Sequence, residues 1–484
     1  MKPLPLRSLF ALPLVLGLCA CAIGPEHQPS RLDSMPASFK HGAGWLPATP
    51  GGGTERGDAA WWRPFADARL EGLLLELATA NPGLEQARAR LRQAEAALKG
   101  QQAELFPQVQ GNVAVNRSSS AGQVSKSHDL GLALSWLPDL WGRVRRQTEA
   151  GRAELEAAEA ETAALRLSLQ TSLAENYVTL RILDRQRTLL QETITAYERS
   201  LTLTRNQYEA GMAARADVVQ AQSQLENVRA QLLELVDQRA RAENAIAVLA
   251  GRPPAALDIA ADASLPELPA APAAVPAALL TRRPDLTAAE RRVAAANARI
   301  GVAMSAWLPD LTLNLSGGYR AGQASGWLDA PNKVWAVGPA LALTLFDGGA
   351  RSAQVDQAEA AQEEAAAAWK AAVLAALQET EDALARLRAL EDLSRQQEKV
   401  VALAEENERL VTNRYREGLV SFLEVAVAQN ATLAARRAAL DVRRDRLQAS
   451  MRLVTALGGG WPGLGGAGES GASGAEAVAD REKS

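Results

Sequence analysis

The side chains best able to do chemistry are few: two cysteines and three histidines in 484 residues. The histidines, His27, His41 and His128, form no HExxH motif, and the sequence has neither a GxSxG motif nor a glycine-rich phosphate loop before a helix. Carboxylates are numerous, but in the helical segments they recur at coiled-coil spacing, where an acid is more often solvated or ion-paired than catalytic. We therefore expect no enzyme, no metal site and no bound cofactor.

Both cysteines lie in an N-terminal segment with the pattern of a secretory signal. Two basic residues precede an apolar run, 9–18, that is too short to span a bilayer as a mature helix. Cys19 and Cys21 follow directly, so a chain cleaved after a signal of residues 1–20 can form no disulfide within itself. The chemistry left for Cys21 is modification of its thiol.

The residues around Cys21 resemble the lipobox of bacterial lipoproteins, in which a small residue precedes a cysteine that is diacylated and becomes the new N-terminus. Ala20 before Cys21 fits this pattern, whereas Leu18 before Cys19 does not. Ala22 stands where an aspartate would signal inner-membrane retention, so the resemblance implies the outer membrane. Two or three acyl chains give stable anchoring, because each buried CH₂ contributes about 0.8 kcal/mol. The open alternative is a pair of incidental apolar cysteines.

Composition favours long helices in a duplicated chain. The net charge of −4, from 52 basic and 56 acidic residues, gives no field that would attract nucleic acid. Aromatic residues make up 4% of the chain, and alanine-rich segments carry interspersed charges, as in coiled coils. Length alone suggests about three domains of roughly 150 residues. However, NRYREGLVSFLEVAVAQ at 413–429 echoes NQYEAGMAARADVVQAQ at 206–222, and the offset of 413 − 206 = 207 residues indicates two similar halves.

The chain is expected to divide into an arm, two repeats joined by a linker, and a tail. Residues 21–60 are rich in proline and glycine and predict an extended arm. Repeat 1 spans 61–251, a proline-rich linker spans 252–280, and repeat 2 spans 281–458. The glycine-rich tail, 459–484, is expected to be disordered.

Each repeat is predicted to contain a strand hairpin followed by a long helical hairpin. A proline-free helix of some 65 to 70 residues reaches about 100 Å and must pack with others as a coiled coil. Gly211 and Gly418 break these helices at the hairpin tips. A polar loop is expected between the first two strands. Alternation of apolar and polar residues predicts strands at about 108–117, 128–137, 310–319 and 334–346.

The four predicted strands have the length and the single apolar face of strands that cross an outer membrane. Four strands cannot close a membrane barrel, and an open edge in a bilayer would leave backbone groups without partners. Two copies of the chain would supply eight strands and three copies twelve, and periodicity does not choose between them. The open alternative is a four-stranded sheet in a soluble domain.

These features together resemble the TolC-like outer-membrane factors of bacterial efflux systems, in particular their OprM-like, NodT-type lipoprotein branch. The resemblance covers essentially the whole mature chain. It rests on the duplicated hairpins, the two tip motifs, and the segments Cys21-Ala22-Ile23-Gly24-Pro25, Arg282-Arg283-Pro284-Asp285-Leu286 and Asp347-Gly348-Gly349.

The resemblance implies a mainly α fold with a membrane β-barrel. Three copies would form one barrel of twelve strands, continued in the periplasm by a twelve-helix α-barrel, with the linker in an equatorial region. The implied function is a passive multidrug efflux or export duct that docks with a periplasmic adaptor and an inner-membrane pump, near the tips at Gly211 and Gly418. The alternative is a lipid-anchored periplasmic coiled-coil scaffold or adaptor without a pore, which leaves the four strands unexplained.

The resemblance also implies a gate at the periplasmic helix tips. Leu423 stands where OprM-like proteins place a constricting leucine, and Glu424 matches the first of two acids that ring the entrance in TolC. Val427 replaces the second acid, so we expect a reduced charge filter and a partly hydrophobic constriction. The alternative is that Leu423 and Val427 are coiled-coil seam residues four apart.

A latch is the other feature that the resemblance implies. TolC-like tips join neighbouring hairpins through a tyrosine of the second motif and an aspartate of the first, which are Tyr415 and Asp217 here. Val420 replaces the arginine that accompanies this tyrosine in TolC. The resemblance therefore implies a weaker latch, or one that uses Arg414 or Arg416.

Overall fold

The structure, a computed structural model, describes residues 22–29, 40, 60–269 and 283–459. The predicted signal segment, Cys21, most of the arm, the end of the linker and nearly all of the tail lie outside these residues. The described residues fall into two compact units. Unit 1 holds Arg88–Glu161, Asp285–Ala372 and the described part of Met1–Asp33, and unit 2 holds the described parts of Ser34–Ala87, Thr162–Pro284 and Val373–Ser484.

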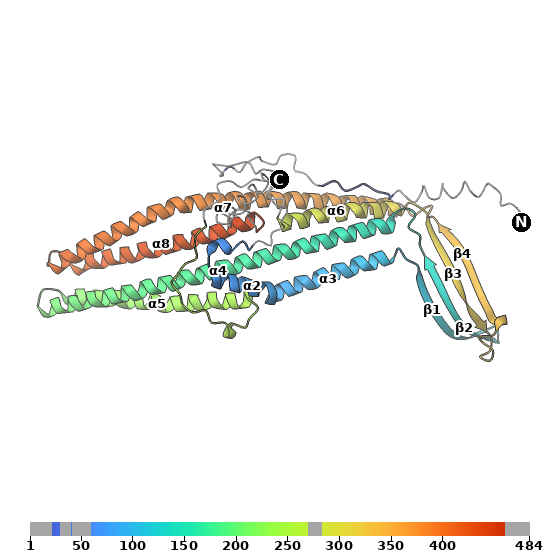
Figure 1. The fold of residues 1–484 in the computed structure, drawn as a ribbon, viewed down its shortest axis with the longest axis horizontal. Coiled ribbons are helices and arrows are strands. Elements are labelled where there is room, and N and C mark those ends of the chain that lie inside the picture. Colours follow the sequence, from blue (N-terminus) through green and yellow to red (C-terminus); the bar gives the residue numbers. More distant parts are fainter. Residues whose placement is uncertain (1–21, 30–39, 41–59, 270–282, 460–484) are drawn as a thin grey trace, which may run out of the picture. The chain divides into compact units, whose positions relative to one another are not determined.

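Unit 1 contains one antiparallel sheet in which the strands follow their sequence order, β1-β2-β3-β4 (Figure 1). The register pairs Val113 with Leu130 and Leu130 with Tyr319, so the apolar positions of neighbouring strands lie side by side. The outer edges of β1 and β4 pair with no further strand among the described residues. The strands are β1 Gln108–Ser120, β2 Gln123–Trp136, β3 Asp310–Ala321 and β4 Lys333–Ala342.

The strand ends differ from those expected from the sequence. The polar loop expected between the first two strands is strand, apart from a two-residue turn at Ala121 and Gly122 with φ of 51° and 83°. The alternation of apolar and polar residues did not predict this part of the hairpin, because serines occupy both faces of the strands next to the turn. The fourth strand ends at Ala342, not at 346, because its partner strand begins at Asp310, opposite Ala342, and offers no further residue for pairing.

Two long helical hairpins follow the strand pairs, and their lengths match residue for residue. Helices α4 (Arg143–Glu209) and α7 (Ala350–Arg416) have 67 residues each, and α5 (Arg215–Leu249) and α8 (Phe422–Ala456) have 35 each. Each long helix lies beside its shorter partner as a hairpin (Figure 1). The predicted duplication is therefore confirmed.

Shorter helices begin at side chains that cap them. Asp67 accepts hydrogen bonds from the nitrogens of Arg69 and Leu70 at the start of α2 (Ala68–Ala80). Asn81 does the same for Gly83 and Leu84 at the start of α3 (Pro82–Ala103). The other short elements are α6 (Pro284–Ser305) and the 3-10 turns η2 (Arg63–Phe65), η3 (Pro254–Ala256) and η5 (Ala330–Asn332).

The core of unit 2 lies between the helical hairpins and α2. Phe65, Leu74, Tyr177 and Leu180 are among its fully buried side chains. Among the described residues, no helix combines the length and the apolar character needed to cross a membrane.

Candidate functional site

The two hairpin tips have the same backbone conformation. Gly211 and Gly418 have φ of 77° and 74°, which an L side chain adopts only at a cost. Met212 N donates to Gln207 O at 2.8 Å, and the equivalent bond from Leu419 reaches Arg414 O at 2.9 Å. A side chain added at either glycine would meet only open space. Glycine is therefore favoured at each position by the backbone conformation of the turn and not by a lack of room for a side chain.

The residues expected to form the gate lie in the first turn and a half of α8. Leu423 and Val427 are 59% and 62% exposed, and Glu424 is exposed beside them. Phe422 and Val425 occupy the buried face instead. Leu423 and Val427 are therefore not seam residues within this chain, which weakens that alternative. Their role in a constriction stays a prediction.

The two latch residues each have another partner within the chain. Tyr415 is buried, packs edge-on against Phe422 with ring centroids 5.6 Å apart, and donates its hydroxyl to Thr204 Oγ1 at 3.1 Å. Asp217 accepts from the backbone nitrogen of Ala214 at 3.2 Å and so caps α5. Burial raises the pKa of Tyr415, and the nearby charge of Asp217 raises it further. A latch between neighbouring hairpins stays a prediction.

The residues expected to support the latch are not placed beside it. Arg416 Nη1 donates to Asn413 Oδ1 at 3.4 Å, and both Arg414 and Arg416 are exposed. Val420 packs against the core of unit 2. Within the described residues Asp217 pairs with the backbone of Ala214 and neither arginine pairs with it, so neither replaces the arginine of TolC.

A buried polar layer between the hairpins was missed from the sequence. Gln224 of α5 donates from Nε2 to Gln429 Oε1 of α8 at 3.3 Å, and Tyr415 of α7 donates to Thr204 of α4. Tyr197, Gln224, Gln429 and Thr204 are all buried. The sequence does contain a signal for this layer. On α4, Tyr197 and Thr204 follow Leu183 and Leu190 at the same seven-residue spacing, where a coiled-coil seam is expected to have apolar residues.

The arm residues next to Cys21 are held firmly in unit 1. Arg146 of α4, itself buried, donates from Nε to Ile23 O and from Nη2 to Gly24 O, both at 3.1 Å. Asn297 of α6 donates to Pro25 O at 2.9 Å. Gly24, with φ of 104°, lies so close to Gly301 that a Cβ on either would collide with backbone. We call this contact the arm clamp, formed by Ile23-Gly24-Pro25, Arg146, Asn297 and Gly301.

The sheet exposes large apolar side chains where a soluble sheet would expose polar ones. Val113 is 67% exposed and Trp335 is 73% exposed in the single chain. Val109, Val115, Leu132, Val337 and Leu341 are also exposed. An apolar environment therefore suits this sheet better than water.

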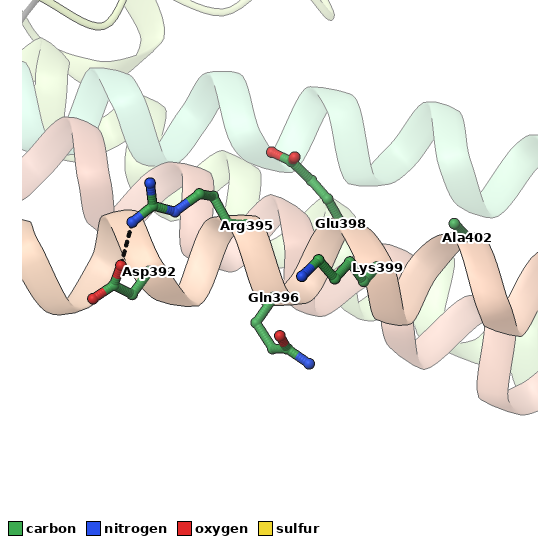
Figure 2. Close-up of a pocket in the computed structure, with 6 residues that line it drawn as sticks. All are labelled: Asp392, Arg395, Gln396, Glu398, Lys399 and Ala402. Carbon is green, nitrogen blue, oxygen red and sulfur yellow. Dashed lines mark hydrogen bonds and ion pairs between the residues drawn. The ribbon is translucent and has the colours of Figure 1, made fainter.

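A shallow hollow on α7 has no catalytic character. Figure 2 shows Arg395 turned toward Asp392, with which it forms an ion pair, while the neighbouring side chains spread along the helix surface. All lining residues come from one helix, so no second element closes over a ligand. They are Asp392, Arg395, Gln396, Glu398, Lys399 and Ala402. No cluster of His, Cys, Asp and Glu suited to a metal ion occurs among the described residues.

A sheet with exposed apolar residues and open edges, joined to two long helical hairpins with matched tips, defines the class of outer-membrane channels with a helical extension. The family model for outer membrane efflux proteins matches residues 73–252 and 275–459. The chain belongs to this outer membrane efflux protein family, and the resemblance stated from the sequence is confirmed.

Individual relatives are similar over nearly their whole length. The pyoverdine export outer membrane protein OpmQ of Pseudomonas putida is 31% identical over 94% of this chain and 98% of its own. Outer membrane protein OprJ of Pseudomonas aeruginosa is 31% identical over 94% and 96%. Among solved structures, the outer-membrane channel OprN matches with a TM-score of 0.83 and 30% identity, over 91% of this chain and 100% of that one. The chain is thus an outer-membrane component of an efflux or export system.

Proposed function

We propose that three copies of the chain form one passive exit duct from the periplasm to the exterior. The observation that carries this proposal is the four-stranded sheet with two open edges and exposed apolar residues. Open edges in a bilayer are costly, and three copies supply twelve strands for one closed barrel. The helical hairpins of the three copies would continue it as a twelve-helix tube. The alternative scaffold without a pore does not account for the similarity to channels.

Oligomer mass tests this proposal most directly. Light scattering of the full chain in detergent, corrected for bound detergent, should give three times the 51.4 kDa of the unprocessed chain, less the signal and plus lipid. A dimer would supply eight strands, the smallest number that closes a membrane barrel. That result would contradict the proposed trimer and indicate an eight-stranded barrel instead. A monomer that forms no conducting pore in planar bilayers would contradict both.

We propose that the periplasmic tips close the duct at rest. Leu423, Glu424 and Val427 are exposed in the single chain, as residues that face a pore or a neighbouring copy must be. Leu423 and Val427 would form an apolar constriction that sheds water, and Glu424 would supply its charge. Tyr415 and Asp217 of neighbouring hairpins would latch the closed state. Single-channel conductance of Asp217→Ala and Tyr415→Phe tests the latch, which fails if neither variant changes the conductance.

We propose that a periplasmic adaptor docks at the tips around Gly211 and Gly418, together with an inner-membrane pump that supplies the energy. The duct itself would then need no catalytic residue and no cofactor. The tips support this because their turns are exposed and free of packing contacts on the outer side. Photo-crosslinking from Met212 and Leu419 should capture one adaptor protein, whereas crosslinks confined to copies of this chain would contradict docking there.

We propose that Cys21 carries the lipid anchor. The arm clamp holds the residues that directly follow it, which suits a fixed attachment point. Mass spectrometry of the mature N-terminal peptide should show acyl chains on Cys21 in the wild-type chain and in Cys19→Ser, but none in Cys21→Ser. An unmodified Cys21 would contradict the anchor.

A further inference from the structure

The six charged side chains of the sheet are sorted between its two faces. Residues paired across strands share a face, so the register places Val113, Leu130 and Tyr319 together on one face, which we call the apolar face. By the alternation of side chains along each strand, the opposite face carries Asp129, Asp310 and Arg320. The apolar face carries only cations: Arg117, Lys126 and Lys333.

Two of these cations lie directly opposite each other on neighbouring strands. Arg117 of β1 pairs with Lys126 of β2, and both side chains are exposed. We call these two residues the basic pair. Like charges in such a pair destabilise a hairpin, and no acidic side chain of the described residues forms an ion pair with either. On the opposite face, by contrast, Arg320 forms an ion pair with Asp129. The basic pair is therefore left without the anion that would relieve its repulsion.

Aromatic side chains gather just below the basic pair. Tyr319 and Trp335 lie at neighbouring levels of the apolar face. Trp327, between β3 and β4, packs edge-on against His128 with ring centroids 5.6 Å apart, and His128 is two residues from Lys126 on the same face. Tryptophan and tyrosine concentrate where the hydrocarbon layer of a membrane meets the headgroups. These residues therefore indicate the edge of the hydrocarbon layer on the sheet.

The basic pair lies beyond this edge, at the height of the headgroups. The apolar residues of β3 run from Leu311 to Tyr319, about 27 Å along the strand and roughly 20 Å in height at a tilt of about 40°. Arg117 is four residues beyond Val113, which shares the level of Tyr319, and so lies roughly 10 Å higher. Since the headgroup layer is about 5–8 Å thick, these long side chains can bend back to a phosphate within it.

We propose that the basic pair binds the phosphate of a lipid in the outer leaflet of the outer membrane. The proposal rests on the proposed duct: β2 runs from the hairpin turn to Trp136, where the periplasmic helices follow, so the turn and the basic pair lie on the outer side. One phosphate accepts hydrogen bonds from both cations and joins two groups that otherwise repel each other. A lipid fits better than a free phosphate because exposed Val113 and Val115 lie directly below the pair, where acyl chains would cover them.

The test measures lipid binding to the full-length chain in non-ionic detergent by native mass spectrometry. The probe is lipid A with two phosphates. Arg117→Gln or Lys126→Gln alone should weaken binding about fivefold, and the double variant about thirtyfold. Arg117→Lys keeps the charge and should retain most of the affinity. Arg320→Gln is the matched control, because it removes a cation of the same sheet from the opposite face and should leave binding unchanged.

Thermal unfolding of the same samples separates a lost site from a lost fold. Without lipid, the double variant should be at least as stable as the wild type, because the repulsion between Arg117 and Lys126 is gone. Added lipid A should raise the unfolding temperature of the wild type and have a smaller effect on the double variant. An equal rise in both would contradict the proposal even if the variant bound less lipid in the spectrometer.

Two further probes identify the ligand. Equal binding of lipid A and of its dephosphorylated form would show that acyl chains alone hold the lipid, and displacement of lipid A by an equal concentration of inorganic phosphate would show a free-anion site; either result overturns the proposal. Oligomer mass and conductance separate it from the duct. If the double variant is trimeric, conducts and binds lipid A like the wild type, the lipid site fails and the duct stands. If the wild type forms neither trimer nor pore, the duct fails, and the lipid site fails with it.

Discussion

The hydroxyl of Tyr415 donates a hydrogen bond to Thr204 Oγ1 at 3.1 Å, across 211 residues of sequence and between the two helical hairpins. Both side chains are buried, so water cannot replace the bond if either partner is lost. Within one chain, the two helical hairpins are therefore held together by a specific polar contact and not only by apolar packing.

Removing the acceptor should cost more than removing the donor. Tyr415→Phe loses one net hydrogen bond, about 1 kcal/mol, whereas Thr204→Val also leaves a buried hydroxyl unpaired, at about 1–3 kcal/mol. Thermal unfolding in detergent should rank the wild type above Tyr415→Phe and Tyr415→Phe above Thr204→Val. The double variant should be more stable than the sum of the two losses predicts. Strict additivity would show that the bond contributes nothing.

Unit 2 should lose stability at high pH. Burial raises the pKa of Tyr177, Tyr197 and Tyr415 above the ordinary value of 10.0. For Tyr177 the charge of Asp67 adds to this effect. A tyrosine whose pKa is raised in the folded state stabilises the fold fully below about pH 10. This stabilisation is lost as the pH rises through the folded-state pKa.

Tyr177→Phe isolates the largest part of this pH dependence. The variant loses the one bifurcated hydrogen bond that the hydroxyl donates to both carboxylate oxygens of Asp67, and the bond that it accepts from Arg181 Nε. It is therefore less stable at neutral pH, but its unfolding temperature should fall less steeply between about pH 10 and 12. The exposed Tyr208 provides a matched control, since Tyr208→Phe should follow the wild type. An unchanged slope in Tyr177→Phe would contradict the burial argument.

Alanine at the tip glycines should destabilise the turns. Gly211→Ala and Gly418→Ala each place a Cβ in the left-handed region, at about 1–2 kcal/mol, without any steric clash. Local hydrogen exchange at Met212 and Leu419 should accelerate. Gly72→Ala, in the interior of α2 with free space around it, should instead be neutral or stabilising by about 0.5–1 kcal/mol. Equal effects at all three positions would remove the special role of the turns.

A charge at Val427 should change the selectivity of the pore. Val427→Asp restores the second acid that the resemblance leads one to expect, and the ratio of cation to anion permeability should rise. Val427→Asn is the matched control, because it adds polarity without charge and should raise water entry more than selectivity. Identical permeability ratios in the wild type and Val427→Asp would place this side chain away from the conducting path.

Loss of the arm clamp should free the start of the mature chain. Gly301→Ala directs a Cβ at the carbonyl oxygen of Ile23, and Arg146→Gln removes charged donors whose hydrogen bonds contribute about 1.5–3 kcal/mol. Both variants should speed tryptic cleavage after Arg31. Gly100→Ala, in α3 with nothing near it, should leave the rate unchanged. A wild-type cleavage rate in Gly301→Ala would show that the close approach is not needed for the clamp.

The sequence predicted those parts of the fold that depend on local pattern. Alternation identified all four strands, and the two tip motifs located both turns at Gly211 and Gly418. Strand ends were less accurate because they depend on the partner: the pairing of Asp310 with Ala342 ends β4, and no local signal near 342 carries that information.

The contacts of the tip residues could not be predicted from pattern. Tyr415 was recognised, but its partner Thr204 was not, because the choice depends on how two hairpins pack over a separation of 211 residues. The arm clamp was missed for the same reason: Gly24 and Gly301 were not connected by any motif, and only their backbone approach links them.

The arm clamp also implies an order of events during synthesis. The chain is made from its N-terminus, yet Gly24 contacts Arg146, which lies 122 residues later, and Pro25 contacts Asn297, which lies 272 residues later. The arm therefore cannot reach its final place until α6 of the second repeat exists. Its complete seating therefore requires the first helix of the second repeat, and a chain that stops before α6 can hold its own beginning only through Arg146 of α4.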